Sequence, residues 1–151
     1  MKIIVLAGGL STERDVSLSS AAGICRTLVE KGHDAFLLDV FMGLENAPEN
    51  LEDVFTLPDH GLEIVKNIST EEPDLEAVKA SRPDQSDCFF GPNVIELCRL
   101  ADITFLGLHG GEGENGKLQA SFDLLGIKYT GPDSLGCAVA MHKGVAKQIF
   151  L

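Results

Sequence analysis

The sequence predicts an α/β fold: an open parallel sheet with helices on both faces, interrupted by one acidic insertion. Short apolar runs end at glycines, as buried parallel strands often do, and segments with helical periodicity follow them. The chain has 151 residues, of which 44% are hydrophobic, which is enough for one core and too few for a second full domain. We therefore expect one soluble folded domain.

The first part of the chain is predicted to form a strand, a helix and a second strand. Residues 2–7 are aliphatic or β-branched and stop at two glycines, which suits a central strand buried on both faces. Residues 16–30 carry apolar side chains at helical spacing; a serine or threonine at 11–12 is the expected cap and Gly32 the expected terminator. Residues 35–41 form the next strand, which completes a right-handed βαβ unit.

The last third repeats this alternation. Residues 93–100 are predicted as a helix and residues 103–108 as a strand, followed by a glycine-rich loop. Residues 116–125 form the next expected helix and residues 128–130 a short strand. Alternating elements of this kind favour a parallel sheet with helices on both sides.

The acidic insertion, residues 41–92, separates these two parts. It holds twelve of the 23 acidic residues and three basic ones, so its net charge of −9 is most of the chain's −11. It also contains five of the six prolines. This composition predicts a solvated and partly irregular segment.

Charge and cysteine content exclude several classes of function. A net charge of −11 without clustered Lys or Arg argues against binding to nucleic acid or to an anionic membrane. The apolar start is too short for a signal peptide or a membrane span, so a cytoplasmic protein is expected. The four cysteines form no CxxC pair and are expected to be reduced and buried.

The loop after the first expected strand, residues 8–17, reads GGLSTERDVS. Its glycines let the backbone turn sharply, and the helix that follows presents unpaired N–H groups, which together suit an anion. Glu13 and Asp15 would repel a phosphate there. A small amino acid resolves the conflict, because its ammonium contacts a carboxylate while its own carboxylate contacts an N–H group or an arginine. The alternative is that both acids only complement the helix dipole.

The loop after residues 103–108 reads HGGEGENGK from His109 and opens the next helix. His109 is either a site residue or a packed structural histidine. Gly111–Gly116 fits the G-x-G-x-x-G pattern of dinucleotide-binding loops. That pattern belongs to the first strand–helix turn of such folds, and its two glutamates would oppose a pyrophosphate. A nicotinamide-dependent oxidoreductase is therefore kept only as an alternative.

Both loops resemble signatures of the D-alanine:D-alanine ligase family. Residues 5–17, VLAGGLSTERDVS, are similar to its amino-terminal signature, and residues 105–119, FLGLHGGEGENGKLQ, to its second. Residues 129–131 (YTG) and 140–143 (AMHK) continue the match. Two long motifs in the right order make the resemblance specific. It spans nearly the whole chain and is weakest across residues 41–92.

The resemblance implies a Rossmann-like pre-ATP-grasp substrate domain over residues 1–133. It implies an ATP-dependent enzyme that phosphorylates the carboxylate of one D-alanine, so that the amine of a second D-alanine attacks the acyl phosphate. The product is the cell-wall dipeptide. The implied partners are D-alanine and ATP, with a homodimer as the full-length form.

The same motifs assign expected roles to residues of the first and second loops. Glu13 corresponds to the acid that engages the ammonium of the first D-alanine and orients a group of catalytic residues. Val16 would lie against that substrate and His109 would approach its carboxylate. Gly9 and Ser11 would line the same pocket.

Lys143 corresponds to a lysine that reaches the nucleotide phosphates, and His142 stands before it where the family usually has Asp. In the family the ATP pocket and the Mg²⁺ (or Mn²⁺) ligands come from later domains, so no metal ligand is expected here. Residues 134–151 keep a helical apolar pattern to Leu151 without a stop signal. We expect them to start the connection to the ATP-grasp domain, to carry an exposed or partner-covered apolar patch, and the chain alone to be inactive.

A second alternative comes from the missing ATP machinery: the chain is then a non-catalytic binding or interaction module. The sequence leaves open whether the second substrate is D-alanine, D-lactate or D-serine.

Overall fold

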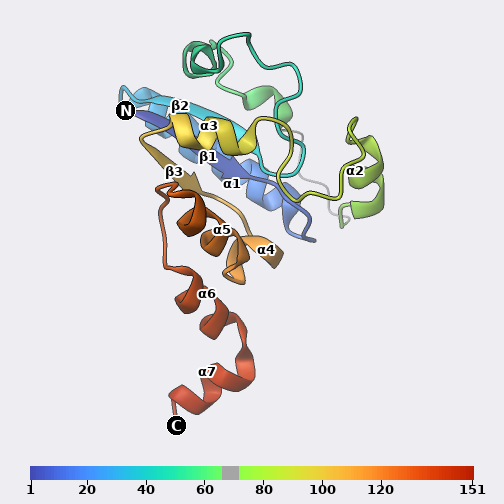
Figure 1. The fold of residues 1–151 in the computed structure, drawn as a ribbon, viewed down its shortest axis with the longest axis vertical. Helices are drawn as coiled ribbons and strands as arrows, with labels where there is room; N and C mark the ends of the chain where they lie inside the picture. Colours follow the sequence, from blue (N-terminus) through green and yellow to red (C-terminus); the bar gives the residue numbers. More distant parts are fainter. Residues whose placement is uncertain (66–71) are drawn as a thin grey trace.

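A computed structural model describes residues 1–65 and 72–151 as a three-stranded parallel sheet between layers of helices (Figure 1). The strands are β1 (Lys2–Ala7), β2 (Asp34–Asp39) and β3 (Ile103–Leu106), in the order β2-β1-β3. Both pairings are parallel. Because β1 lies in the middle, its apolar run is covered on both faces, as its composition predicts.

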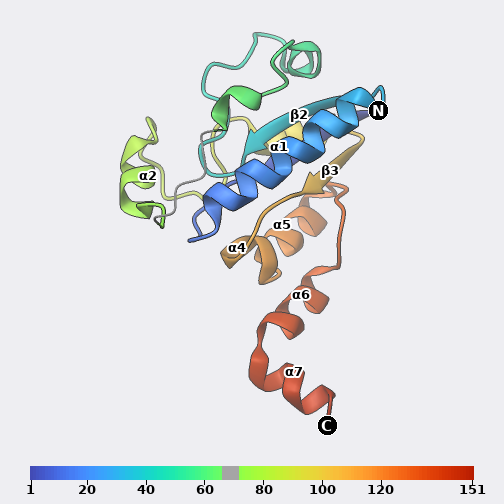
Figure 2. The ribbon, with the colours of Figure 1, turned by 180° about the vertical axis from the view of Figure 1, so that it is seen from behind.

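Helices cover both faces of this sheet, so the predicted fold class is confirmed. Helix α1 (Arg14–Glu30) packs on one face, against the alternate β1 residues Ile3 and Val5 (Figure 2). Helices α3 (Val94–Leu100) and α5 (Lys117–Leu125) pack on the other face. The two faces carry separate hydrophobic clusters, which is the two-sided burial expected of a parallel sheet.

The sequence predicts the end of helix α1 correctly but not its N-terminal cap. Its terminator is Gly32, with φ +82, whose N–H bonds to the Val29 carbonyl at 2.9 Å. Its N-cap residue is Glu13, without a side-chain cap bond, so the predicted cap at 11–12 is wrong. The Ser11 hydroxyl donates instead to the second loop.

The acidic insertion leaves the end of β2 and returns beside it. The N–H of Gly91 bonds to the Val40 carbonyl at 2.9 Å, and Leu44 N–H to the Pro92 carbonyl at 2.9 Å. Within the insertion lie the 3₁₀ turns η1 (Leu51–Thr56) and η2 (Leu62–Ile64) and the helix α2 (Leu75–Ser81). The described residues of the insertion, 41–65 and 72–92, are partly irregular as predicted, whereas residues 66–71 lie outside the described part; η1 also contributes two buried side chains, Val54 and Phe55, to the core.

Two further expectations are corrected. Residues 128–130 form a single bridge, Thr104 with Tyr129, instead of a strand, because the Leu106 N–H of β3 bonds to the Thr130 side-chain hydroxyl at 3.1 Å and not to a backbone carbonyl. Of the four cysteines, Cys88 is exposed, whereas the other three are buried. Burial raises the pKa of the Cys25 thiol to about 11 and that of Cys98 to about 12, which keeps both protonated.

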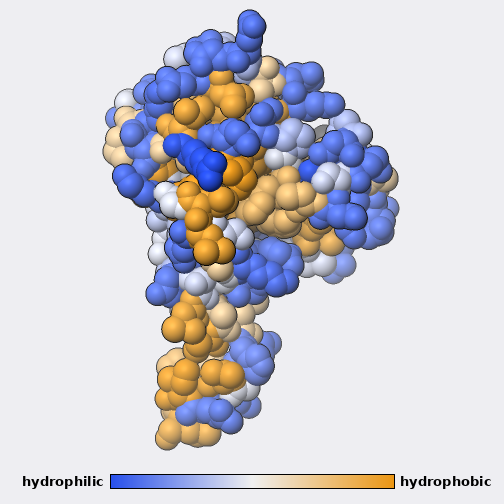
Figure 3. Space-filling view, viewed as in Figure 1, coloured by the Kyte–Doolittle hydropathy of each residue, from blue (hydrophilic) through white to orange (hydrophobic). Residues whose placement is uncertain are grey.

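The last helices, α6 (Ser134–Met141) and α7 (Lys143–Ile149), extend away from the sheet (Figure 1). The predicted continuous helix is interrupted at His142. Apolar side chains are exposed along this extension: Leu135 at 71% and Phe150 at 88%. They form the hydrophobic surface at the lower end of Figure 3, which agrees with the predicted apolar patch.

Within the described parts of the chain, none of the helices combines the length and the apolar character that crossing a membrane requires.

Candidate functional site

The two loops after β1 and β3 meet at the carboxyl edge of the sheet, where parallel folds bind their ligands. Glu13 comes from the first loop, and His109 and Glu114 come from the second. One ligand atom of each lies within 4.8 Å of the others. Two carboxylates and an imidazole at this spacing can hold a cation, either an ammonium group or a metal ion.

A serine in the first loop fixes the spacing of this cluster. The Ser11 hydroxyl donates to the His109 carbonyl oxygen at 2.6 Å, and its oxygen accepts the N–H of Glu13 at 3.2 Å. The backbones that carry Glu13 and His109 are therefore tied to one side chain. The Gly110 φ of +68 then turns the second loop into the short helix α4 (Gly111–Glu114), which carries Glu114.

A second serine, Ser17, connects the two loops where they leave the sheet. Ser17 is fully buried on α1; its hydroxyl accepts the Gly8 N–H at 3.0 Å and donates to the Gly107 carbonyl at 2.7 Å. Each glycine follows directly from a strand, so this hydroxyl connects the ends of β1 and β3. It replaces the ladder bonds that the diverging loops cannot make to one another.

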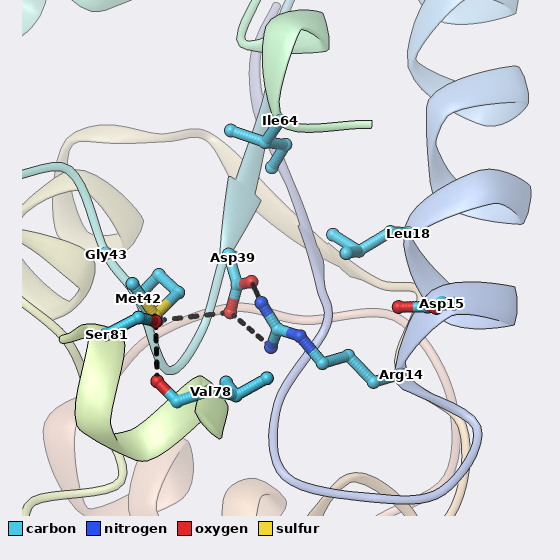
Figure 4. A pocket seen from close by; sticks show the side chains of 9 residues that line it. All are labelled: Arg14, Asp15, Leu18, Asp39, Met42, Gly43, Ile64, Val78 and Ser81. Carbon is cyan, nitrogen blue, oxygen red and sulfur yellow. Dashed lines mark hydrogen bonds and ion pairs between the residues drawn. The ribbon is translucent and has the colours of Figure 1, made fainter. Parts of the chain in front are cut away.

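An ion pair between Arg14 and Asp39 holds the base of the first loop (Figure 4). Both side chains are buried, and the Arg14 Nη1 also donates to the Gly9 carbonyl at 2.7 Å. Asp39 Oδ1 accepts the N–H groups of Phe41 at 2.9 Å and Met42 at 3.1 Å. The pair thus connects the glycine turn to the end of β2 through satisfied hydrogen bonds.

A cavity of about 370 Å³ lies beside this ion pair, between the start of α1, the end of β2 and α2 (Figure 4). Its apolar wall is made by Leu18, Met42, Ile64 and Val78. None of Glu13, His109 and Glu114 lines it, so the cavity is separate from the charged cluster.

The structure brings most of the predicted site residues together. Gly9, Ser11 and Glu13 lie in the first loop, and His109 contacts Ser11 through its carbonyl. Val16 stands on the first turn of α1 and is 47% exposed, so it does not belong to the buried face of that helix, unlike the apolar residues that follow it.

Lys143 is placed apart from these residues. It is the first residue of α7, and helix α6 lies between it and the second loop (Figure 1). Its side chain is exposed and makes no ion pair with the described residues.

The glycines of the second loop are explained by packing rather than by a dinucleotide. A Cβ at Gly113 would collide with the Leu108 side chain, and one at Gly116 with the Ser134 carbonyl at the start of α6. The Gly116 φ of +91 also favours glycine. The nicotinamide alternative rests on this spacing alone and loses its support.

Sequence reasoning missed several residues that build the site. Glu114 was noted only as an obstacle to a pyrophosphate, and Arg14, Ser17 and Asp39 received no role. The available signals were the polar residues within or beside otherwise apolar segments: Ser17 on the buried face of a helix, and Asp39 in a buried strand.

His142, the residue before Lys143, caps α7. The Nδ1 atom of His142 accepts the backbone N–H of Val145 at 3.2 Å. An aspartate in the same place would accept the same bond, since Asp is among the preferred N-cap residues. Histidine and aspartate would therefore cap α7 through different atoms, with the same backbone N–H as donor.

This cap gives a prediction. We expect His142→Ala to lose about 1 kcal/mol of local α7 stability, because the first turn is left without its acceptor. His142→Asp should restore it. Amide hydrogen exchange of Val145 measures the difference: exchange should be faster in the alanine variant and near the wild-type rate in the aspartate variant. Equal exchange in all three proteins would contradict the capping role.

Comparison with known proteins identifies the family. The family model described as D-ala D-ala ligase N-terminus matches residues 2–132. The D-alanine–D-alanine ligase of Lacticaseibacillus casei is 46% identical over 151 residues, covering 100% of this chain and 42% of that protein. That of Pediococcus pentosaceus is 49% identical over 156 residues, covering 100% of this chain and 43% of the other. The chain thus spans about two fifths of the length of these relatives.

Solved structures agree on the fold. The Bacillus anthracis D-alanine–D-alanine ligase complexed with ATP matches with a TM-score of 0.60 at 22% identity, over 99% of this chain and 35% of that one. The Coxiella burnetii ligase matches with a TM-score of 0.58 at 24% identity, over 99% and 41%. The domain match over residues 2–132, the identity to curated ligases and the shared fold lead to one conclusion: the chain belongs to the D-alanine–D-alanine ligase family, in which it corresponds to the amino-terminal domain.

Proposed function

We propose that this chain is the substrate-binding amino-terminal part of a cytoplasmic, ATP-dependent enzyme that joins two D-alanine molecules into a peptidoglycan precursor. The observation that carries the proposal is the Glu13–His109–Glu114 cluster at the carboxyl edge of the sheet. Within a family of D-alanine ligases, a site of two carboxylates and an imidazole beside a helix start suits a small zwitterion.

In this proposal the ammonium of the first D-alanine lies against Glu13, with Glu114 adding a second carboxylate. An ammonium has three N–H donors and so can use both acids. His109 approaches the substrate carboxylate, and the exposed Val16 side chain contacts the substrate methyl group. Gly9 and Ser11 hold the first loop in the shape that presents Glu13, as the Ser11 bonds to both loops support.

The chemical step that we propose needs ATP and Mg²⁺ (or Mn²⁺). When bound, ATP supplies the phosphate that activates the first D-alanine carboxylate as an acyl phosphate, which the amine of the second D-alanine attacks, with release of phosphate. Lys143 is this chain's candidate for the nucleotide phosphates; its exposed ammonium, without an ion pair in the described structure, fits that role. The metal ligands are assigned to other domains of the enzyme.

A chimeric ligase tests the function. Residues 1–151 replace the matching stretch of the Lacticaseibacillus casei ligase, to which they are 46% identical. We expect D-alanine-dependent release of ADP and formation of the dipeptide, measured by a coupled assay and by mass spectrometry. A folded chimera that hydrolyses no ATP in response to D-alanine would contradict the proposal.

Residues 1–151 on their own are proposed to catalyse no ligation, because one transition-state donor alone is worth roughly a hundredfold in rate and this part supplies few of them. Calorimetry of the isolated chain with D-alanine, ATP and NAD, followed by a search for a protein partner, separates the alternatives: a chain that binds none of the three ligands and binds a protein would be an interaction module. The full-length enzyme is proposed to be a homodimer, which analytical ultracentrifugation of the chimera tests.

A further inference from the structure

Three serine side chains on the first loop and α1 reach across to the second loop. Those of Ser11 and Ser17 donate to backbone carbonyl groups, of His109 at 2.6 Å and of Gly107 at 2.7 Å. The third, Ser20, is different, because its Oγ lies 3.1 Å from the Nε2 atom of the His109 ring. Of these three serines, Ser20 is the one that contacts the imidazole ring.

The direction of the Ser20–His109 hydrogen bond follows from counting protons. The Ser20 Oγ also lies 3.1 Å from the backbone carbonyl oxygen of Ser17. A carbonyl oxygen only accepts, and a hydroxyl has one proton to give. The Ser20 hydroxyl therefore donates to the Ser17 carbonyl, and its oxygen accepts a hydrogen bond from the Nε2–H of His109.

We propose that Ser20 is a positioning residue that fixes His109 with its proton on Nε2, leaving Nδ1 as the ring nitrogen that meets the ligand. The contact of one ring nitrogen sets the tautomer of the other, as in other functional histidines. Among the described residues Nδ1 of His109 makes no hydrogen bond, and one of the two ring nitrogens lies within 4.8 Å of a carboxylate oxygen of Glu13 and of Glu114. This inference rests on the proposed amino-acid site and names the atom that serves it.

The consequence for the ligand is specific. Nε2–H donates to Ser20 whether the ring is neutral or doubly protonated, so any change of protonation is confined to Nδ1. With a proton, Nδ1 donates to a carboxylate oxygen of the amino acid, which is the contact that the proposed function gives to His109. A ring free to flip or to change tautomer would present either nitrogen and bind the ligand less well.

Nitrogen NMR of the ¹⁵N-labelled chain tests the tautomer directly, without any enzyme assay. Long-range ¹H–¹⁵N spectra show which ring nitrogen carries the proton, and a His109→Gln spectrum assigns the signal among the four histidines. In the wild-type protein under mildly basic conditions we expect a protonated Nε2 and an unprotonated Nδ1. In Ser20→Ala the two signals should move towards the mixed values of free histidine, and Ser20→Thr should restore the wild-type pattern, since a threonine hydroxyl can make the same backbone bond.

The chimeric ligase adds a functional readout. Ser20→Ala should raise KM for D-alanine by up to about tenfold, the worth of one net hydrogen bond, with a smaller change in kcat. Ser20→Thr and the control Ser19→Ala should match the wild type. A proton on Nδ1 in the wild type, or an unchanged His109 spectrum in Ser20→Ala, would overturn the inference. A normal tautomer pattern in a chain that fails to bind D-alanine would instead refute the proposed ligand.

Discussion

Replacing Asp39 with alanine is expected to lower the unfolding free energy of this chain by about 3–5 kcal/mol, because Arg14 is left charged and buried without its partner. Arg14 keeps only the Gly9 carbonyl as a close acceptor, and the N–H groups of Phe41 and Met42 lose the carboxylate oxygen that they share. Urea unfolding followed by circular dichroism measures the loss. It should exceed that of truncating an exposed acid.

Two further variants separate charge from packing. Asp39→Asn keeps the shape of the side chain, so we expect it to retain some backbone bonds while losing the ionic partner of Arg14. The double variant Arg14→Met/Asp39→Leu removes both charges with little change of volume, and we expect it to be more stable than Asp39→Ala. If the single and double variants unfold at the same urea concentration, the uncompensated charge is not the cause of the loss.

Hydrophobic patterning carries enough information for the sheet and its covering helices, because each depends on a local run of side chains. The apolar run of β1 and the helical periodicity of α1 predict both elements, with each predicted boundary at most two residues from the observed one. The same reasoning fails where the structure of a segment depends on contacts with residues distant in the sequence. Residues 128–130 have strand-like composition, yet form one bridge because the Thr130 side-chain hydroxyl takes the Leu106 N–H that a longer ladder would use.

In the candidate site, too, some features can be predicted from local sequence and others depend on tertiary contacts. Both loops are visible in the sequence, because a glycine-rich turn between a strand and a helix is a local pattern. The proximity of Glu13 to Glu114, within 4.8 Å, is not visible there, since the residues are far apart in the sequence and approach only when β1 and β3 pair. Asp39 likewise gains its role from Arg14, which the chain brings to it by folding around α1. Pairing across the sheet edge is tertiary information that no single segment contains.

Replacing Glu13 with glutamine is expected to lower kcat/KM for D-alanine in the chimeric ligase by at least about a hundredfold, equivalent to about 2.7 kcal/mol. The variant keeps the size of the side chain and removes the charge that we propose binds the substrate ammonium. Because Glu13 makes no side-chain cap bond to α1, the substitution leaves the described hydrogen bonds of that helix intact. The effect should therefore appear in catalysis and not in the unfolding free energy.

Glu112→Gln is the matched control, since Glu112 lies in the same glycine-rich loop as Glu114, two residues away, and pairs with Lys117 at 3.4 Å. It removes the same charge from the same edge of the sheet, so a purely long-range electrostatic effect would make the two variants alike. A direct contact with the ammonium predicts a large loss for Glu13→Gln and a small one for Glu112→Gln. Equal losses would show that the acidity of the loops matters, and that Glu13 has no contact of its own with the substrate.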